Sequence, residues 1–388
     1  MTTKTPPRDF GFGEDEQMLR DLARRFLDEN LPVERLRQLV AADSEAAYVR
    51  GERPGWDEGL WKQIVELGWT GLAVPEEQGG IGAKLVAIAA LVEEVGRHAL
   101  PSPLVATLCA SHVLRAAGTA HAKAWLSRIA EGTAASLAIT DARGSWDPSD
   151  TDVHASAGDA LTLSGRACFV QDAFKCEAFV VSARRNGGTV LCVVPRDAEG
   201  LTLEQSRIHD LTRDQATLHF DGVRVSPGDL VAEDGAAALR AGWPAVLVTV
   251  AADLCGTSEW QLQTTVDYAR ERKQFDRQIG FFQAVKHPLV NGMIENDRAR
   301  SILYHAACQI DEGEADAETA ARMAKSAASD AGAFLSDRSV QLHGGIGFTW
   351  ECDVHLFFKR SLHNQVLYGD AAYQRARIAD HLIGPIGA

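Results

Sequence analysis

Three stretches in the last third of the chain decide how the sequence is interpreted: RKQF at residues 272–275, FQAVKH at 282–287 and QLHGGIGF at 341–348. They stand beside long patterns in which apolar residues recur every three or four positions, as on one face of a helix. Alanine is frequent in these patterns, which suits close packing of helices. We therefore expect residues 235–388 to form a four-helix bundle. The predicted helices cover residues 236–271, 281–312, 316–342 and 366–383.

Two other patterns precede the bundle. From Glu14 to about Ala130 the apolar residues again have helical spacing, with no strand-like alternation between them. From about Ala135 short β-type runs alternate with turn residues. We therefore predict an N-terminal α-helical domain, residues 1–134, and a middle antiparallel β domain, residues 135–234, that is a barrel or a sandwich. The predicted strand runs are 137–140, 161–164, 178–182, 189–194, 216–220 and 223–225.

Composition limits the classes of function. The formal net charge is −14, so no surface for nucleic acid or for an anionic membrane is expected, because phosphate binding requires a concentrated positive field. The seven cysteines include no Cys-x-x-Cys pair, which favours reduced thiols over disulfides or a zinc site. Residues 1–10 lack a signal pattern, and no apolar run reaches the ~20 residues of a spanning helix. We expect a cytoplasmic protein without a metal site or membrane span.

In their order and spacing, the three C-terminal stretches resemble the acyl-CoA dehydrogenase family, whose members oxidise the Cα–Cβ bond of acyl-CoA thioesters. ELGWTGLAVPEEQGG at residues 66–80 and EEVGR at residues 93–97 are similar to the N-terminal domain of that family. The resemblance covers residues 9–384 and implies the three-domain fold expected above, with subunits associating through the bundle. It also implies FAD as cofactor, an acyl-CoA substrate and electron-transfer flavoprotein as the electron acceptor.

The resemblance implies that one group of residues serves a neighbouring subunit. In the family, the arginine matched by Arg272 reaches across a dimer interface and offers its forked donors to the pyrophosphate of the neighbour's FAD. The glycines matched by Gly344 and Gly345 let the backbone approach the ADP part of that cofactor closely. The residues implied at this site are Arg272, Gln274, Phe275, Gln283, Gln341, Gly344 and Gly345.

A second group would contact the flavin ring bound to the same chain. The family usually reads Thr-Glu-Pro-x-x-Gly-Ser-Asp and Trp-Ile-Thr-Asn, where the indole packs on the ring and the threonine of the second motif binds flavin N5. This chain reads TDARGSWD at residues 140–147 and FVQD at residues 169–172. Neither Phe169 nor Gln171 is the residue usual in the family, but Phe169 can still stack on the ring and Gln171 could donate through its amide. Thr140, Phe169 and Gln171 are therefore candidate flavin contacts, and the alternative is that they are ordinary strand and turn residues.

The position of the catalytic base departs most from the family. Removal of an α-proton from a thioester requires a carboxylate over Cα, with a raised pKa in a dry pocket. Where the family has Tyr-Glu-Gly-Thr this chain reads LYGD, so Tyr368 stands at the glutamate position and Asp370 two residues later. A phenol with an ordinary pKa of ~10 is a poor base for such a proton. A few relatives place the carboxylate at the position of Val246, and Asp253 lies about two turns further along that helix.

Residues for the chain's own flavin ring and base thus differ from the family, whereas residues for a neighbour's FAD match it. The first hypothesis is a subunit that completes the FAD site of a homologous acyl-CoA dehydrogenase subunit and has little activity alone. Some actinobacterial members form such α2β2 pairs, and GFTWE at residues 347–351 and FKR at 358–360 resemble that branch. The second is a self-sufficient homo-oligomeric flavoenzyme with a displaced acid, Asp370 or Asp253, or with flavin-dependent oxygen chemistry. The third is a flavin-free scaffold.

Overall fold

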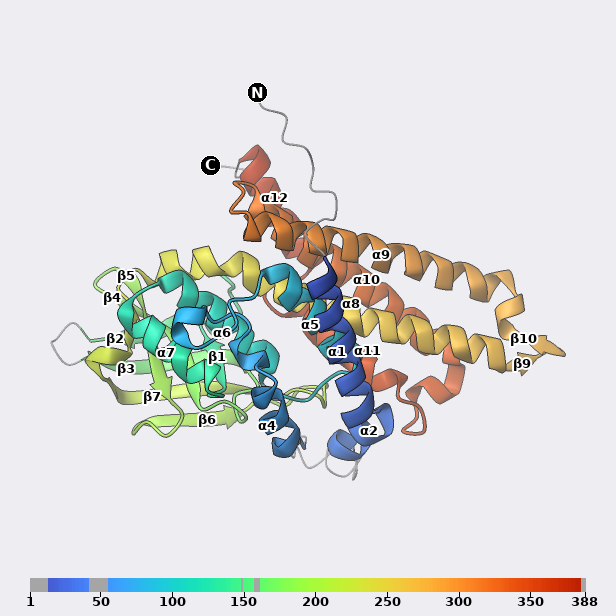
Figure 1. Ribbon diagram of the computed structural model, residues 1–388, viewed down its shortest axis with the longest axis horizontal. Helices are drawn as coiled ribbons and strands as arrows, with labels where there is room; N and C mark the ends of the chain where they lie inside the picture. The colour runs from blue at the N-terminus through green and yellow to red at the C-terminus, as the bar shows by residue number, and fades with distance from the viewer. Residues whose placement is uncertain (1–12, 42–54, 148, 157–160, 385–388) are drawn as a thin grey trace.

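The structure, a computed structural model, describes residues 13–41, 55–147, 149–156 and 161–384. The expectation about a signal pattern in residues 1–10 lies outside the described residues. Along the chain, a first set of helices is followed by a β-sheet and then by a second set of helices (Figure 1). This order confirms the predicted fold class.

The first part of the chain is helical, as its periodicity predicts. Its two most buried helices, α5 and α6, carry long apolar runs and pack against the long helix α8 (Gly235–Glu271). Gly118 ends α6 with a φ of 66°, a left-handed conformation that glycine adopts without strain. The elements are α1 (Glu14–Asn30), α2 (Val33–Ala41), α4 (Glu58–Glu66), η1 (Trp69–Gly71), η2 (Glu76–Gln78), α5 (Leu85–Arg97), α6 (Leu104–Ala117) and α7 (Ala120–Ala130).

The middle part is a single eight-stranded sheet in the order β6-β7-β3-β2-β4-β5-β8, with β1 also paired to β4. Most ladders are antiparallel, but β4 pairs in parallel with β1 and with β2, which departs from the purely antiparallel prediction. The sequence does not predict β2, β6 and β8, because these strands are short and β6 is largely exposed. The strands are β1 (Ala135–Ala138), β2 (Asp152–Ala155), β3 (Leu161–Gln171), β4 (Ala178–Arg185), β5 (Gly188–Pro195), β6 (Leu201–Gln205), β7 (Gln215–Val225) and β8 (Leu230–Ala232), with η3 (Pro227–Asp229) before β8.

The described residues of the last part, 235–384, contain five α-helices where the sequence predicts four. The predicted helix 366–383 corresponds to α12 alone, and α11 precedes it. The two are separated by a turn in which Tyr368 and Gly369 have φ values of 57° and 95°, and a helix does not continue through such a conformation. The elements are α8, β9 (Lys273–Gln274), β10 (Arg277–Gln278), η4 (Ile279–Phe281), α9 (Gln283–Asp311), α10 (Ala317–His343), η5 (Gly344–Phe348), α11 (Val354–Val366) and α12 (Ala371–Ile383).

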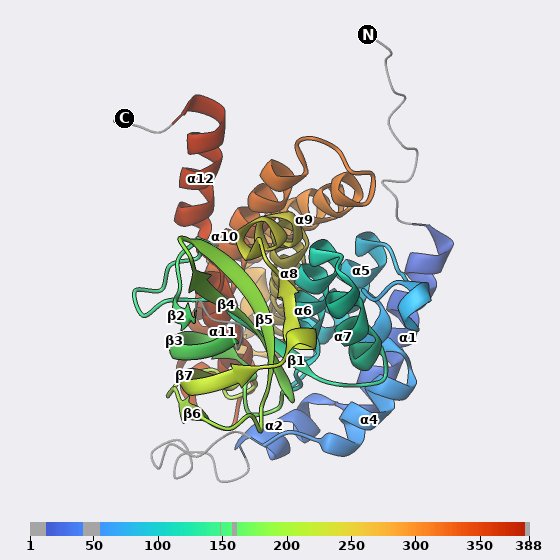
Figure 2. The same ribbon diagram turned by 90° about the vertical axis from the view of Figure 1, so that its left-hand side faces the viewer.

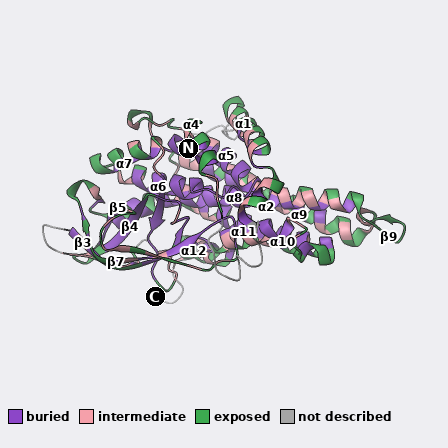
Figure 3. Cartoon of the chain, turned by 90° about the horizontal axis from the view of Figure 1, so that it is seen from below, coloured by how far each residue is buried: buried purple, intermediate pink, exposed green. Residues whose placement is uncertain are grey.

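Helix α8 joins the two ends of the molecule. At its start it contacts β5 and α6, and it then runs with α9 and α10 into an arm that ends in the β9–β10 hairpin (Figure 1). Figure 2 shows the sheet on one side of α8 and the first set of helices on the other. The centre of the molecule is buried, whereas the end of the arm is exposed (Figure 3).

Helix α8 is also apolar. Among the described residues it is the one helix long and apolar enough to cross a membrane, but 72% of its most apolar window is buried inside the protein. It therefore has the character of a core helix, packed between the sheet and the surrounding helices.

Candidate active site

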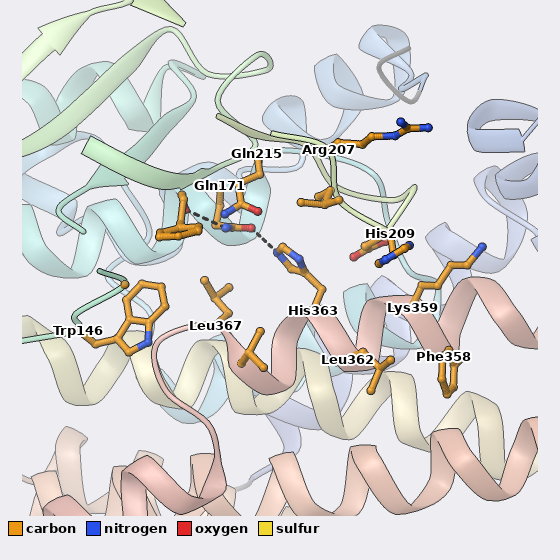
Figure 4. Close-up of a pocket in the computed structure, with 15 residues that line it drawn as sticks. Trp146, Gln171, Arg207, His209, Gln215, Phe358, Lys359, Leu362, His363 and Leu367 are labelled. Carbon is orange, nitrogen blue, oxygen red and sulfur yellow. Dashed lines mark hydrogen bonds between the residues drawn. The ribbon is translucent and has the colours of Figure 1, made fainter. Parts of the chain in front are cut away.

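A cavity of about 760 Å³ lies between the sheet and α11 (Figure 4). The sheet contributes Phe169 and Gln171 from the end of β3, and Gln215 from the start of β7. The loop between β6 and β7 contributes residues 207–210. The other lining residues are Gly144, Trp146, Phe358, Lys359, Leu362, His363, Val366 and Leu367. The wall is therefore mainly apolar, with a few polar groups at defined places, as in many small-molecule sites.

A β-bulge turns Phe169 into this cavity. The register of β3 against β7 shifts between Ala167 and Val170, and Phe169 between them has a φ of 58°. Its ring remains 40% exposed although it is apolar. Non-glycine residues rarely adopt such a conformation, and bulges often re-aim side chains at functional sites. The predicted flavin contact thus lines the cavity, in a conformation that no periodicity predicts.

Gln171 is held in one orientation by His363. Its amide nitrogen donates to the carbonyl of Phe169 at 2.9 Å, so its amide oxygen faces His363 Nε2 at 2.6 Å (Figure 4). Burial lowers the pKa of His363, so the imidazole is neutral at pH 7. Because an amide oxygen only accepts, His363 Nε2 must carry the proton and donate it. The family resemblance points to Gln171 but gives no indication of His363.

Asp210 is a cavity residue that sequence reasoning missed. It is 1% exposed, and its Oδ1 accepts hydrogen bonds from the backbone N–H and the hydroxyl of Thr212 at 2.8 and 2.7 Å. Its Oδ2 is buried and has no hydrogen-bond partner among the described residues. The Asp-x-Thr spacing is typical of a side-chain-stabilised turn, but it does not indicate which cavity that turn borders.

Thr140, the third predicted ring contact, lies elsewhere. It is 3% exposed and forms an isolated β-bridge with Cys168. It is absent from the cavity lining in the described structure. The structure therefore brings together Phe169 and Gln171 but not Thr140.

Tyr368, at the base position, is buried in an aromatic cluster. Its ring packs against Trp146 and Trp243 with centroid distances of 5.3 and 5.1 Å. Burial raises the pKa of the Tyr368 hydroxyl well above its ordinary value. At neutral pH this group is therefore ionised even less than a free phenol, so less phenolate is available to accept a proton. Val246, at the alternative base position, is fully buried in α8.

The two candidate displaced acids have other partners. Asp370 caps α12 by accepting a hydrogen bond from the backbone N–H of Tyr373 at 2.8 Å. Asp253 is fully buried and accepts from Arg360 at 2.9 and 2.7 Å and from Arg213 at 2.5 Å. Burial opposes ionisation of Asp253, but the charges of Arg360 and Arg213 outweigh it and lower its pKa. Neither acid is among the described cavity residues.

Asp253 belongs to a larger buried network of charges. Arg213 also binds Asp172 at 2.9 Å, and Lys175 bridges Asp172 and Asp214 at 2.7 and 3.2 Å. The network connects α8, α11 and the end of the sheet beside the cavity. Its charged groups pair with one another, although Arg213 Nε has no hydrogen-bond partner among the described residues, and the network supports the walls of the site.

The residues matched to a neighbour's FAD lie at the end of the arm or beside it, away from the cavity (Figure 1). Arg272 is exposed, and its guanidinium has no partner among the described residues. Phe275, at the tip of the β9–β10 hairpin, is 85% exposed. A Cβ added to Gly344 or Gly345 would meet nothing within 4 Å. The other three, Gln274, Gln283 and Gln341, are exposed as well.

Comparisons with known proteins agree on one family. The sequence models described as the N-terminal and C-terminal domains of acyl-CoA dehydrogenase match residues 13–133 and 247–383. The acyl-CoA dehydrogenase IpdE2 of Mycobacterium tuberculosis is 31% identical, over 92% of this chain and 92% of its own length.

Solved structures extend the agreement over nearly the whole chain. A variant of the Tcur3481–Tcur3483 steroid ACAD is 31% identical with a TM-score of 0.82, covering 95% of this chain and 98% of that chain. A chain of the ChsE4–ChsE5 complex from Mycobacterium tuberculosis is 25% identical with a TM-score of 0.84, covering 97% and 99%. The chain therefore belongs to the acyl-CoA dehydrogenase family, whose members are FAD-dependent oxidoreductases.

Proposed function

We propose that this chain is the subunit of a heteromeric acyl-CoA dehydrogenase that completes a partner's FAD site and lacks a base of its own. One observation carries the proposal. The arm residues that the resemblance matches to cofactor contacts are exposed, whereas the position that it matches to the base holds Tyr368 between two tryptophans. A chain built in this way contributes to a neighbour's site more readily than it performs the chemistry alone.

The arm fits the phosphate-bearing part of FAD. Arg272 offers paired donors with no competing partner among the described residues, and such a fork matches the oxygens of a phosphate. Gly344 and Gly345 leave open space where a side chain would stand, so a ligand can approach their backbone. Phe275 is almost fully exposed, which suits a residue covered by another chain.

When bound, FAD supplies the acceptor for the two electrons that leave the acyl-CoA. The residues of this chain would bind and orient the cofactor and enclose the cavity. Arg272 would hold phosphate, Phe169 would offer an aromatic face, and the apolar side of α11 would exclude water from the cavity. Removal of the α-proton would fall to a carboxylate on the partner, because the described cavity of this chain places none at the base position.

The partner we propose is a homologous acyl-CoA dehydrogenase subunit that has its catalytic glutamate. The ChsE4–ChsE5 complex and the Tcur3481–Tcur3483 ACAD, both similar to this chain, are named as pairs. For this chain itself we propose three domains, residues 1–134, 135–234 and 235–388. We also propose that it is located in the cytoplasm and that electron-transfer flavoprotein is the electron acceptor. The steroid substrate named for one of these relatives makes a steroid-linked acyl-CoA the first substrate to try.

The decisive experiment measures flavin content in the assembled complex. Arg272→Ala removes a charge-assisted contact that contributes ~2–4 kcal/mol once it is desolvated at an interface, so FAD occupancy and affinity should fall. Arg270→Ala is the matched control, because Arg270 lies on the same helix end, is 73% exposed and pairs with Asp267. If Arg272→Ala retains flavin as fully as Arg270→Ala does, the proposed role of the arm is wrong.

A further inference from the structure

A second pocket, of about 430 Å³, lies outside the candidate active site and shares no lining residue with it. It is bordered by α8 between Trp260 and Glu271, by the segment that joins α10 to α11, and by the start of α2. No lysine or arginine stands among its lining residues. Four carboxylates do, and they belong to Asp267, Glu271, Glu351 and Asp353.

Two of these four carboxylates have no cation of their own. Glu271 and Glu351 are exposed, and in the described parts of the chain neither has a hydrogen-bond or ion-pair partner. The other two already pair with arginines of this chain, at 3.5 and 2.6 Å. Carboxylates that share a pocket repel one another, and a bound cation relieves this repulsion. The charge of the pocket therefore favours a positively charged ligand.

The pocket also contains a nearly buried neutral acceptor. His343 lines it and is only 6% exposed. Its Nδ1 lies 2.8 Å from the carbonyl oxygen of Ser339, and because a carbonyl only accepts, Nδ1 carries the proton. Burial lowers the pKa of His343, so the imidazole is neutral at pH 7 and its Nε2 is an acceptor. No described residue donates to Nε2, yet it is not among the enclosed atoms without a partner, so a ligand in the pocket can reach it.

The imidazole is fixed before any ligand arrives. It stacks on the ring of Tyr268, with a centroid distance of 4.3 Å and an angle of 22° between the planes. Tyr268 lines the same pocket, and its hydroxyl donates to the carbonyl of His343 at 3.5 Å. A group held in this way loses little freedom on binding, so it suits recognition. The pocket thus combines a fixed acceptor, aromatic rings and two free carboxylates.

We propose that this pocket is a docking site for an arginine side chain of a partner protein, which donates to His343 Nε2 and pairs with Glu271 and Glu351. A guanidinium presents five N–H donors in one plane, so it can serve an imidazole and a carboxylate together. It also stacks on aromatic rings and is less strongly hydrated than the ammonium of lysine. Arginine is therefore the cation that these groups fit best.

The pocket continues the surface that the proposed partner would cover. Glu271 directly precedes Arg272, and Ile346, another lining residue, directly follows Gly345. A chain that lies over the arm would therefore pass beside the pocket. The inference rests on the proposed function and adds to it one feature by which the partner is recognised.

The test uses N-acetyl-arginine amide as the probe, titrated into the full chain. Tryptophan fluorescence follows binding, because Trp260 lines the pocket. The comparison ligand is N-acetyl-citrulline amide, which has nearly the same shape but a neutral urea group. We expect saturable binding of the arginine probe, and binding of the citrulline probe at least about tenfold weaker, because its hydrogen bonds are not charge-assisted. This comparison needs only the wild-type protein, so it does not depend on whether a variant folds.

Variants locate the site. The double variant Glu271→Gln, Glu351→Gln removes both free charges from exposed positions and should bind the arginine probe about tenfold more weakly. His343→Phe keeps a flat ring against Tyr268 but removes the acceptor, so binding should weaken roughly fivefold. Glu77→Gln, an exposed glutamate on η2, is the matched control and should bind as the wild type does.

Three results would overturn the proposal. They are failure to bind the arginine probe, equal affinity of the wild type for the two probes, and spermidine bound as tightly as the arginine probe. Unchanged binding in the double glutamate variant would also overturn it, because the guanidinium would then bind elsewhere. All of these results leave the role of Arg272 untouched, because that role is measured by FAD in the complex.

Discussion

The cavity and the arm are built in opposite ways. Around the cavity, buried charges such as Asp253 and Arg213 have partners on other elements of the same chain. On the arm, Arg272 is exposed without a side-chain partner in the described structure, and Phe275 is almost fully exposed. Exposed cationic and aromatic residues are typical of surfaces that another molecule covers. This difference agrees with our proposal that a second chain covers the arm.

The same comparison separates what the chain keeps from what it loses. The resemblance matches the exposed residues of the arm to contacts with a neighbour's FAD. At the position that the resemblance matches to the base, this chain has Tyr368, packed between Trp146 and Trp243. The cavity remains open beside this cluster, with Asp210 and Gln171 on its wall. In our proposal, the chemistry that this chain has lost is proton removal.

The largest expected effect concerns catalysis by the chain alone. Purified without its partner, the chain should oxidise acyl-CoA with an artificial electron acceptor at a rate ~10²–10⁴-fold lower than that of the complex. This factor is the usual contribution of a general base. The reason is that Tyr368 is a buried phenol whose pKa burial raises further. Activity of the isolated chain equal to that of the complex would contradict this. In that case Asp210→Asn and Asp370→Asn would identify the acid responsible.

Restoring the carboxylate should not restore activity. In Tyr368→Glu the new side chain would lie against the indoles of Trp146 and Trp243, at a position that is not among the described residues lining the cavity. Strong rescue by this single substitution would show that the cluster opens and that Tyr368 alone silences the site.

The sequence predicts the arm better than the cavity. Periodicity predicts α8, α9 and α10 within a few residues, because each is long and amphipathic over many turns. The family resemblance then points to Arg272 and the two glycines that follow α10. These are local features of the chain, so they can be identified from the sequence alone.

The cavity depends on contacts between residues far apart in the chain. Asp210 meets Arg360 through Thr212, and His363 meets Gln171 across 192 positions. The turn at Tyr368 and the bulge at Phe169 require positive φ values in residues that seldom adopt them. No spacing or composition rule predicts such pairs, which is why Asp210 and His363 escape sequence reasoning.

The next largest effect is on stability at the cavity. Asp253→Ala leaves Arg360 and Arg213 buried without their shared carboxylate, and breaking such a network costs ~3–5 kcal/mol. Denaturant unfolding at neutral pH measures this loss of unfolding free energy. Phe275→Asn on the arm is the contrasting variant. Asparagine tolerates a positive φ such as the 53° found there, so the free energy of unfolding should change by less than ~0.5 kcal/mol. If both variants lost a similar amount of unfolding free energy, the cavity would not differ from the arm in how strongly its residues stabilise the fold.

The smallest effect is the pH dependence contributed by Lys325, which supports the turn that carries Tyr368. Its Nζ donates to Ser329 Oγ at 2.9 Å and to the carbonyls of Gln365 and Gly369 at 2.9 and 3.0 Å. Burial lowers the pKa of Lys325 to about 7. In the unfolded chain the pKa is ~10.4, so between these values the unfolded state binds more protons and stability must rise with pH. Below pH 7 both states are protonated and the cost of burying the ammonium is present in full.

Lys325→Met removes this titration. Compared with the variant, the wild-type protein should gain about 3–4 kcal/mol of unfolding free energy between pH 7 and pH 10, as the buried ammonium loses its proton. Lys123→Met, an exposed site on α7, should leave the wild-type slope unchanged. Unfolding curves at each pH measure the three slopes. If Lys325→Met has the wild-type slope, the ammonium keeps its proton throughout this range. The turn at Tyr368 would then be held by a charged lysine throughout this pH range.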